Sequence, residues 1–230
     1  DVFWAYTRAS FDDIDVILPS LVKDIGNIAN WNDSQKVIAL VGLTGFRHGN
    51  TGKPRRLPKN EEELEEQKRL YPEDAKKRVY TGERTGIGAE SLIASEVYRS
   101  KDSVTFKFTG KEDVPQEHEY NDSTEEGRRI LAIVDSALKG KGPEDRLFAT
   151  TTTANNKVLN SLVPDPNREI SISTEDRTYT ETPHKLEMKN LRTHVGTTLA
   201  KKELAKRIGA YRQSISGKSD KAIALAFKTL

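Results

Sequence analysis

The stretch SVTFKFTGK at residues 103–111 has the pattern of a β-strand followed by a turn. Its apolar residues alternate with polar ones, so that one face of the strand is apolar and the other is polar. The apolar face consists of Val104, Phe106 and Phe108, and the turn contains Gly110 and Lys111. A strand of this kind inside a chain with mostly helical patterns indicates a small sheet inserted into a helical body.

Two further β-like runs flank this strand. Residues 91–98 precede it, and residues 115–120 follow it. Short polar segments at 100–102 and 110–113 separate the three runs, as the turns of a hairpin would. We therefore expect an antiparallel meander of three strands.

Helical patterns precede the meander. Apolar residues recur at helical spacing over 11–30, where Pro19 predicts a break. A second apolar stripe over 37–43 follows capping residues at 32–34 and ends near Gly45.

Downstream of the meander the patterns are again mainly helical. The expected elements are, in order, a helix capped at 122–126 that ends before Gly140, a helix over 153–162, a loop over 164–183, and helices over 185–208 and 218–230 parted by 209–217. The fold class is therefore α+β, mainly helical, with a small inserted three-stranded antiparallel sheet.

Residues 51–84 differ from the rest of the chain. They contain three prolines and a run of acidic residues at 61–66, and they offer few apolar anchors. Such a composition is typical of a solvated segment rather than of a core. We interpret 51–84 as a charged insertion within a single domain that spans 1–230.

The composition excludes several classes of function. The 230 residues include no Cys, which removes disulfide frameworks, thiolate zinc sites and cysteine nucleophiles. The four His are scattered along the chain, so we expect no metal site and no cofactor. No run approaches the 18 apolar residues of a membrane span, so a membrane protein is excluded.

Three cationic residues stand next to predicted rigid elements and suggest phosphate chemistry. Arg47 follows the helix over 37–43, Lys111 lies at the hairpin turn, and Arg192 lies in the helix over 185–208. Guanidinium groups can donate paired hydrogen bonds to the non-bridging oxygens of a phosphodiester in the transition state. A lysine can protonate the leaving oxygen.

Four segments, taken in order, make the chain resemble the type IB DNA topoisomerases, specifically the compact poxviral and bacterial kind. FRHGN at 46–50 is similar to the family's Arg-x-Gly-Asn segment, and TGIG at 85–88 followed by 91–97 is similar to its Tyr-Gly-Leu-x-Thr-Leu strand. VTFKFTGK at 104–111 is similar to its Phe-x-Gly-Lys hairpin, and KNLRT at 189–193 to its Lys-Asp-Leu-Arg-Thr segment.

The resemblance implies a tyrosine-recombinase or topoisomerase IB-like catalytic domain with assigned roles. Arg47 and Arg192 would be the two catalytic arginines, Lys111 the general acid, and Lys189 the basic residue three positions before the second arginine. In this family a tyrosine attacks a DNA phosphate, a 3′-phosphotyrosine forms, and resealing relaxes supercoils without ATP or metal. The implied partner is duplex DNA, and the implied protein is an intracellular, DNA-associated monomer.

The sequence departs from the family in its nucleophile. The resemblance places the nucleophilic Tyr, and a His shortly before it, after the helix that 221–226 resembles, so we expect both beyond Leu230, and the domain to be C-terminally incomplete. Tyr211, the only Tyr after Arg192, falls in an expected inter-helix stretch. A tyrosine recombinase or integrase is one alternative, although Lys189 and the order Thr193-His194 favour the topoisomerase. A non-catalytic DNA-binding module is the other.

The charge distribution is compatible with DNA. The net charge is only +2, but basic residues cluster over 53–78 and over 201–207, and local potential matters more than the total. The acidic run at 61–66 would repel DNA, so we expect it to face away. His48 and His194 lie next to the arginines, and we expect both to be packing residues.

Overall fold

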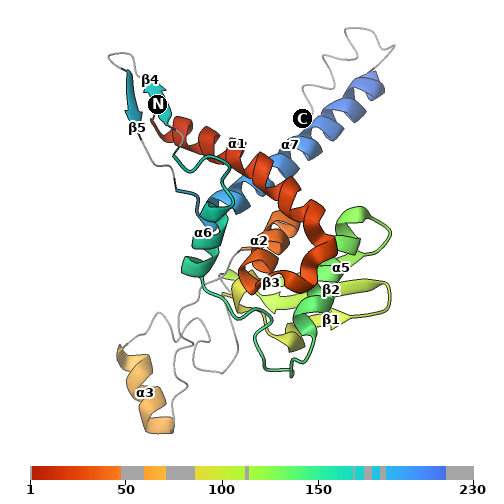
Figure 1. Cartoon of the computed structure of the whole chain (residues 1–230). Coiled ribbons are helices and arrows are strands. Elements are labelled where there is room, and N and C mark those ends of the chain that lie inside the picture. The colour runs from red at the N-terminus through yellow and green to blue at the C-terminus, as the bar shows by residue number, and fades with distance from the viewer. Residues whose placement is uncertain are drawn as a thin grey trace.

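The computed structural model describes residues 2–47, 60–70, 86–111, 114–167, 169–173, 178–181 and 185–215. Over these residues the fold is mixed and mainly helical, with one three-stranded antiparallel sheet and a separate two-stranded one. The first sheet confirms the expected meander. Figure 1 shows helix α2 at the centre, with helices and the three-stranded sheet around it.

The N-terminal helix α1 spans Val2–Lys23 and is followed by a 3₁₀ segment, η1, at Asp24–Asn30. The break expected at Pro19 is wrong, because the proline lies inside α1. Apolar residues on both sides of it, Ile17 and Leu21, are buried against the core. Their packing holds the helix across the one hydrogen bond that proline removes.

Helix α2 spans Asp33–Thr44 and confirms the expected second helix. Asn32 and Gln35 form a reciprocal capping box at its start, and Gly45 ends it in the left-handed conformation, at φ 70°. Every residue from Val37 to Val41 is buried, so the middle of α2 is apolar on every side. It packs against α1 and against three later helices, α5 (Glu125–Leu138), α6 (Thr152–Ser161) and α7 (Met188–Ile215).

The three-stranded sheet has the order β1-β2-β3, formed by Val97–Arg99, Ser103–Thr109 and Pro115–Asn121. The strand expected over 91–98 is only partly correct. The 3₁₀ turns η2 (Ala89–Ser91) and η3 (Ala94–Glu96) come first. Side chains close these turns on the backbone, since Gly88 N donates to Ser91 Oγ and Ile93 N to Glu96 Oε2. Such local bonds compete with the strand ladder.

Helices α5 (Glu125–Leu138) and α6 (Thr152–Ser161) follow the sheet, as expected. Thr124 and Thr151 cap them by accepting hydrogen bonds from backbone N–H groups. The first turn of α5 lies against the end of β3. A Cβ at Gly127 would be 1.7 Å from the Asn121 carbonyl oxygen, so only glycine fits there.

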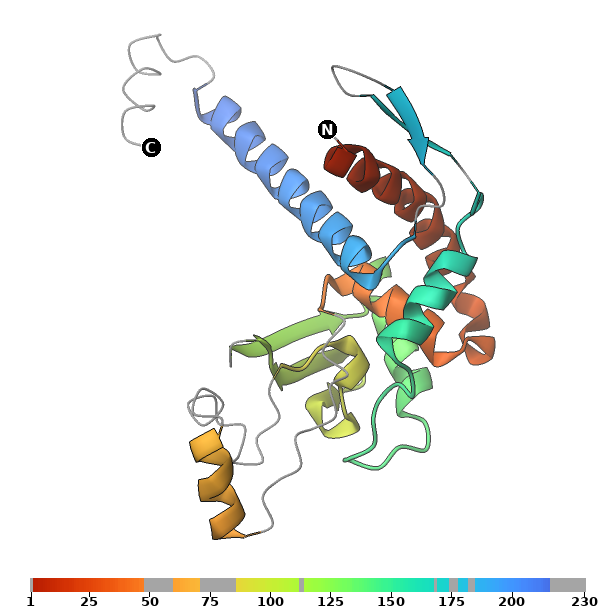
Figure 2. The ribbon, with the colours of Figure 1, turned by 90° about the vertical axis from the view of Figure 1, so that its left-hand side faces the viewer.

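The C-terminal part departs from expectation twice. Instead of a loop over 164–183, β4 (Ile170–Ser173) pairs antiparallel with β5 (Thr178–Glu181), as their β-branched content allows. Helix α7 spans Met188–Ile215 and continues through Gly209, where a break was expected. It extends away from the sheet in Figure 2. The helix expected over 218–230 lies outside the described residues.

Of the charged insertion, the structure describes helix α3 (Glu61–Leu70). The side chains that the structure describes on this helix are exposed or half-exposed, as a solvated helix requires, and Figure 1 shows the helix apart from the body. The rest of 51–84, apart from Asn60, lies outside the described residues. In the part of the chain that the structure describes, none of the helices has the length and apolar content needed to cross a bilayer.

Candidate functional site

Arg47 is held by the end of α2. The Gly45 N–H donates to the Val41 carbonyl at 2.8 Å, and its left-handed conformation turns the chain out of the helix. Phe46 then points into the core and is 5% exposed, whereas the Arg47 side chain is exposed. The local sequence therefore buries one residue and presents the next to solvent.

The ring of Phe46 fastens this helix end to the sheet. Its centroid lies 5.1 Å from that of Phe106, 5.6 Å from Phe108 and 4.9 Å from the imidazole of His118. The contacts to the two phenylalanines are edge-to-face, the arrangement that aromatic pairs prefer. The alternation of β2 supplies both partners on one face, so the strand pattern itself positions Arg47.

Lys111 lies in the turn between β2 and β3, and its side chain is exposed. The Gly110 N–H donates to the Val114 carbonyl at 2.8 Å, which closes the turn. A Cβ on Gly110 would be 3.2 Å from Gln116 Cγ, so the turn leaves little room for a side chain there. Gly110 therefore fixes the backbone immediately before the candidate general acid.

One short segment, Gly86–Glu90, connects these two positions. The Gly86 and Ile87 N–H groups donate to the carbonyls of Gly110 and Thr109, each at 3.0 Å. Two residues further on, the Ala89 N–H donates to the Arg47 carbonyl at 2.7 Å. The structure thus brings the backbones of Arg47 and of the Lys111 turn to opposite ends of the stretch from Gly86 to Ala89.

Arg192 approaches the same place from α7. Leu191 and Val195 are buried, while Arg192 itself is exposed. A Cβ at Gly45 would lie 3.5 Å from Val195 Cγ1, so α7 packs directly on the turn before Arg47. Arg192 is about one helical turn from that contact.

Lys189 lies one turn further from this contact. Its side chain is exposed, and its Nζ lies 2.7 Å from Glu187 Oε2. An exposed ion pair of this kind contributes about 0–1 kcal/mol, so it does not hold the ammonium firmly. Among the residues that the structure describes, no contact draws Lys189 toward Arg47.

Two asparagines of α6 dock the start of α7. Asn160 bonds the backbone of Leu186 through both ends of its amide, at 2.7 and 2.9 Å, and Asn156 Oδ1 accepts from the Met188 N–H at 2.9 Å. The side chains of Leu186 and Met188 are fully buried. These bonds fix the register of the helix turn that carries Arg192.

A buried polar network, which the sequence did not reveal, lies behind the Gly86–Glu90 segment. Glu90 is 0% exposed, and its carboxylate oxygens accept from Asn155 Nδ2 at 2.7 Å and Thr152 Oγ1 at 2.8 Å. Thr150 Oγ1 donates to Asn155 Oδ1 and bonds Ser34 Oγ, both at 2.7 Å. The network joins α2, α6 and the segment beside Arg47.

His194 is a packing residue, as expected. It is 8% exposed, its Nε2 lies 2.8 Å from Asp15 Oδ1, and its ring meets that of Phe11 edge-on. His48 lies outside the described residues. The structure therefore uses His194 to join α7 to α1.

The tyrosines whose side chains the structure describes are Tyr98 and Tyr120. Burial, with the nearby charge of Glu126, raises the pKa of Tyr120 to about 12, which disfavours the phenolate that a nucleophile needs. Tyr98 is 55% exposed on β1. Tyr211 belongs to α7 and not to an inter-helix stretch, which corrects that expectation.

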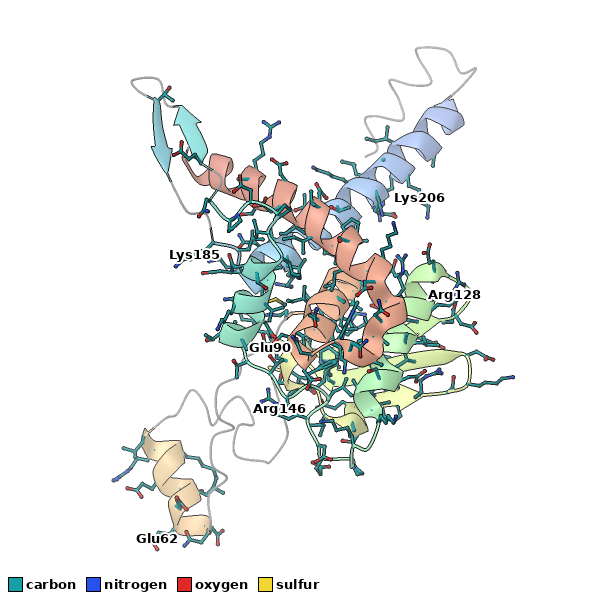
Figure 3. All side chains as sticks on the ribbon, in the orientation of Figure 1. Glu62, Glu90, Arg128, Arg146, Lys185 and Lys206 are labelled. Atoms are coloured by element: carbon teal, nitrogen blue, oxygen red, sulfur yellow. The ribbon has the colours of Figure 1, made fainter. Side chains whose placement is uncertain are left out.

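The basic cluster of α7 is exposed. It consists of Lys201, Lys202, Lys206 and Arg207, and Figure 3 shows Lys206 on the projecting part of the helix. Arg207 pairs with Glu203 at 2.9 Å. In the other cluster, the described residues Lys68 and Arg69 are on α3, and the remainder lies outside the described residues.

Within the described ranges, no three His, Asp or Glu side chains are grouped as a metal ion would need. A comparison with models of protein families found no match, and a comparison with curated proteins found none either.

Proposed function

We propose that the protein cleaves and rejoins DNA strands by the chemistry of a type IB topoisomerase. The observation that carries the proposal is the Gly86–Glu90 segment, whose backbone bonds Arg47 at one point and the Lys111 turn at another. Both residues are exposed there. Two exposed cationic side chains, whose backbones are held beside one short stretch of chain, suit a single phosphodiester.

The reaction needs a nucleophile, stabilisation of the charge on the phosphate, and a proton donor for the leaving oxygen. A tyrosine hydroxyl attacks the phosphorus and gives up its proton to water, forming a phosphotyrosine bond while the bond to the 5′-oxygen breaks. Arg47 and Arg192 donate hydrogen bonds to the non-bridging oxygens, and Lys111 gives a proton to the departing 5′-oxygen. Attack by the 5′-hydroxyl reverses every step and reseals the strand.

Pre-organisation is what the fold would contribute. A charge donor aimed at the transition state is worth about 10²–10³ in rate. Such a donor acts without a change of conformation only if the backbone of its residue is held in place. The buried Phe46 and the Ala89–Arg47 hydrogen bond hold Arg47, and Gly110 holds the Lys111 turn.

The test uses the full-length protein and two duplex substrates, one normal and one with sulfur in place of the scissile 5′-oxygen. We expect the wild type to form a covalent 3′ adduct. Lys111→Ala should cleave normal DNA at least about 100-fold more slowly, and sulfur should restore most of that rate, because a thiolate leaves without a proton. Arg47→Ala and Arg192→Ala should lose about as much and recover little.

The matched control is Lys101→Ala, which removes an exposed lysine from the β1–β2 turn of the same sheet. It should cleave both substrates at the wild-type rate. Equal rescue of all variants, or none for Lys111→Ala, would make the assignment of the general acid wrong. DNA binding without any adduct in the wild type would instead support the non-catalytic binding module.

A further inference from the structure

A basic cleft lies between the end of α5 and the start of α6. It has a volume of about 670 Å³, and Lys139, Lys141 and Arg146 line it together with Asp145 and Thr151. The lining therefore carries three cationic residues and one carboxylate. A cleft of this composition favours an anion.

Two acids at the cleft, Asp145 in its lining and Asp33 behind it, already have partners. Asp145 Oδ2 accepts from the Gly142 N–H at 2.7 Å, which closes the loop on itself. Asp33, just behind the lining, accepts from the Ala149 N–H at 2.6 Å and lies 3.6 Å from Lys36 Nζ. These carboxylates shape the loop, and their charge is partly offset by those contacts.

The start of α6 adds to the positive potential. Thr151 caps this helix of 10 residues and also lines the cleft. The N-terminal end of a helix carries about half a positive charge, which favours anions. The N-terminus of α6 and the lysines thus both contribute positive potential to the cleft.

The cleft adjoins the candidate site. The Arg146 guanidinium donates to the Glu90 carbonyl at 2.6 Å, and the neighbouring residue, Ala89, donates to the Arg47 carbonyl at 2.7 Å. Figure 3 shows Arg146 beside Glu90. Along one DNA strand, phosphates recur every 3.4 Å or so of helix axis, so a strand cleaved beside Arg47 has further phosphates close by.

We propose that this cleft binds a backbone phosphate of duplex DNA that flanks the phosphate being cleaved. The proposal rests on the proposed function, because it takes the position of the strand from Arg47. The contact is to phosphate and not to bases, so it adds affinity and fixes the position of the duplex without reading its sequence.

The test measures the affinity of the chain of residues 1–230 for a short duplex over a range of salt concentrations. The cleft variant is Lys139→Ala/Lys141→Ala, which spares Arg146 because that side chain also bonds Glu90. The matched control, Lys23→Ala/Lys101→Ala, removes two exposed lysines from the end of α1 and from the β1–β2 turn. Both variants lose the same net charge.

We expect the cleft variant to lower the salt slope of log K by about 1 and to weaken binding roughly eightfold at 0.1 M salt, the effect of one lost phosphate contact. The control should keep the wild-type slope. A cleft variant that matches the control, while the wild type binds DNA, would overturn the cleft and leave the proposed function standing.

A second experiment distinguishes binding of DNA from binding of a free phosphate compound. Inorganic pyrophosphate is titrated into each protein by calorimetry. A wild type that binds pyrophosphate through the two lysines but does not bind duplex would overturn the DNA assignment, and a wild type that binds neither would overturn the cleft as a phosphate site. Failure of the proposed function alone is recognised separately, as DNA binding by the full-length protein with no covalent adduct.

Discussion

Glu90 and His194 are both buried polar residues, and each connects two parts of the molecule. We call these connections the Glu90 joint and the His194 joint. They differ in whether every buried polar atom has a hydrogen-bond partner. Both carboxylate oxygens of Glu90 accept hydrogen bonds, from Asn155 and Thr152. His194 bonds Asp15 through Nε2, while its buried Nδ1 has no hydrogen-bond partner within the described structure. The first joint ties Arg47's surroundings to α6, and the second ties α7 to α1.

The difference indicates which part of the candidate site is held more firmly. A buried polar group without a partner costs about 1–3 kcal/mol, whereas a closed network stabilises one arrangement of its elements. The Glu90 joint therefore gives Arg47 and the basic cleft a rigid base. Beyond the His194 joint, α7 exposes Leu199, Leu204 and Ile208, so only its first turns are fixed by the core.

The largest loss of stability should come from breaking the Glu90 joint, in which both carboxylate oxygens have partners. Glu90→Ala removes the acceptor of the Asn155 amide and the Thr152 hydroxyl and leaves a cavity, so we expect a loss of about 3 kcal/mol in the free energy of unfolding. Urea denaturation measures it. Glu119→Ala, an exposed glutamate on β3, is the control and should change stability by less than about 0.5 kcal/mol. A loss for Glu90→Ala as small as the control's would show that the network contributes little.

An intermediate loss of stability should appear at high pH, through Tyr120 on strand β3. Tyr120 has a pKa of about 12 in the folded chain, mainly through burial, against about 10 when unfolded. Between these values only the unfolded chain loses the proton, so stability falls as pH rises from 10 to 12 and is unaffected by this group below 10. Allowing for its partial exposure, we expect a decline of about 1 kcal/mol.

The measurement compares urea unfolding of the wild type and Tyr120→Phe at pH 9 and 11.5. The phenylalanine variant should lack this part of the decline, because lysines and other groups titrate equally in both proteins. Tyr98→Phe, on β1 of the same sheet, should follow the wild type. Identical pH profiles for wild type and Tyr120→Phe would mean that the Tyr120 ring is not buried in the folded chain.

Much of the fold follows from local signals in the sequence. The Asn32 and Gln35 pair and Gly45 mark both ends of α2, and the alternation of residues 103–109 specifies β2. Pro19 misleads because the buried Ile17 and Leu21 hold α1 across it, and Gly209 misleads because one glycine costs a helix only about 1 kcal/mol. The 3₁₀ turns before β1 depend on the side chains of Ser91 and Glu96, which hydrophobic periodicity does not register.

The sequence allowed the residues of the candidate site to be proposed, but not their arrangement in space. Arg47, Lys111 and Arg192 could be proposed from short segments, because each follows a recognisable turn or helix pattern. The Ala89–Arg47 and Gly86–Gly110 hydrogen bonds connect the backbone of Arg47 with the turn of Lys111, and the packing of Val195 on Gly45 brings α7 to the same turn; all three join segments far apart in the chain. Glu90 has the sequence signature of a surface acid, and only the tertiary structure shows that α2 and α6 bury it.

The smallest change in stability should come from breaking the His194 joint, in which only one ring nitrogen has a partner. His194→Leu loses the bond to Asp15 and the edge contact with Phe11, but it also removes the buried Nδ1 that lacks a partner. Asp15 is itself 68% exposed at its side chain, so water replaces the imidazole there. These changes oppose each other, and we expect the free energy of unfolding to change by less than about 1 kcal/mol. Asp15→Ala breaks the same bond but keeps the ring, so it is the matched comparison. It leaves Nε2 of the buried imidazole without this acceptor and should cost about 1 kcal/mol or more. If His194→Leu instead cost as much as Glu90→Ala, the two joints would be equally firm, and Arg192 would have to be regarded as held no less rigidly than Arg47.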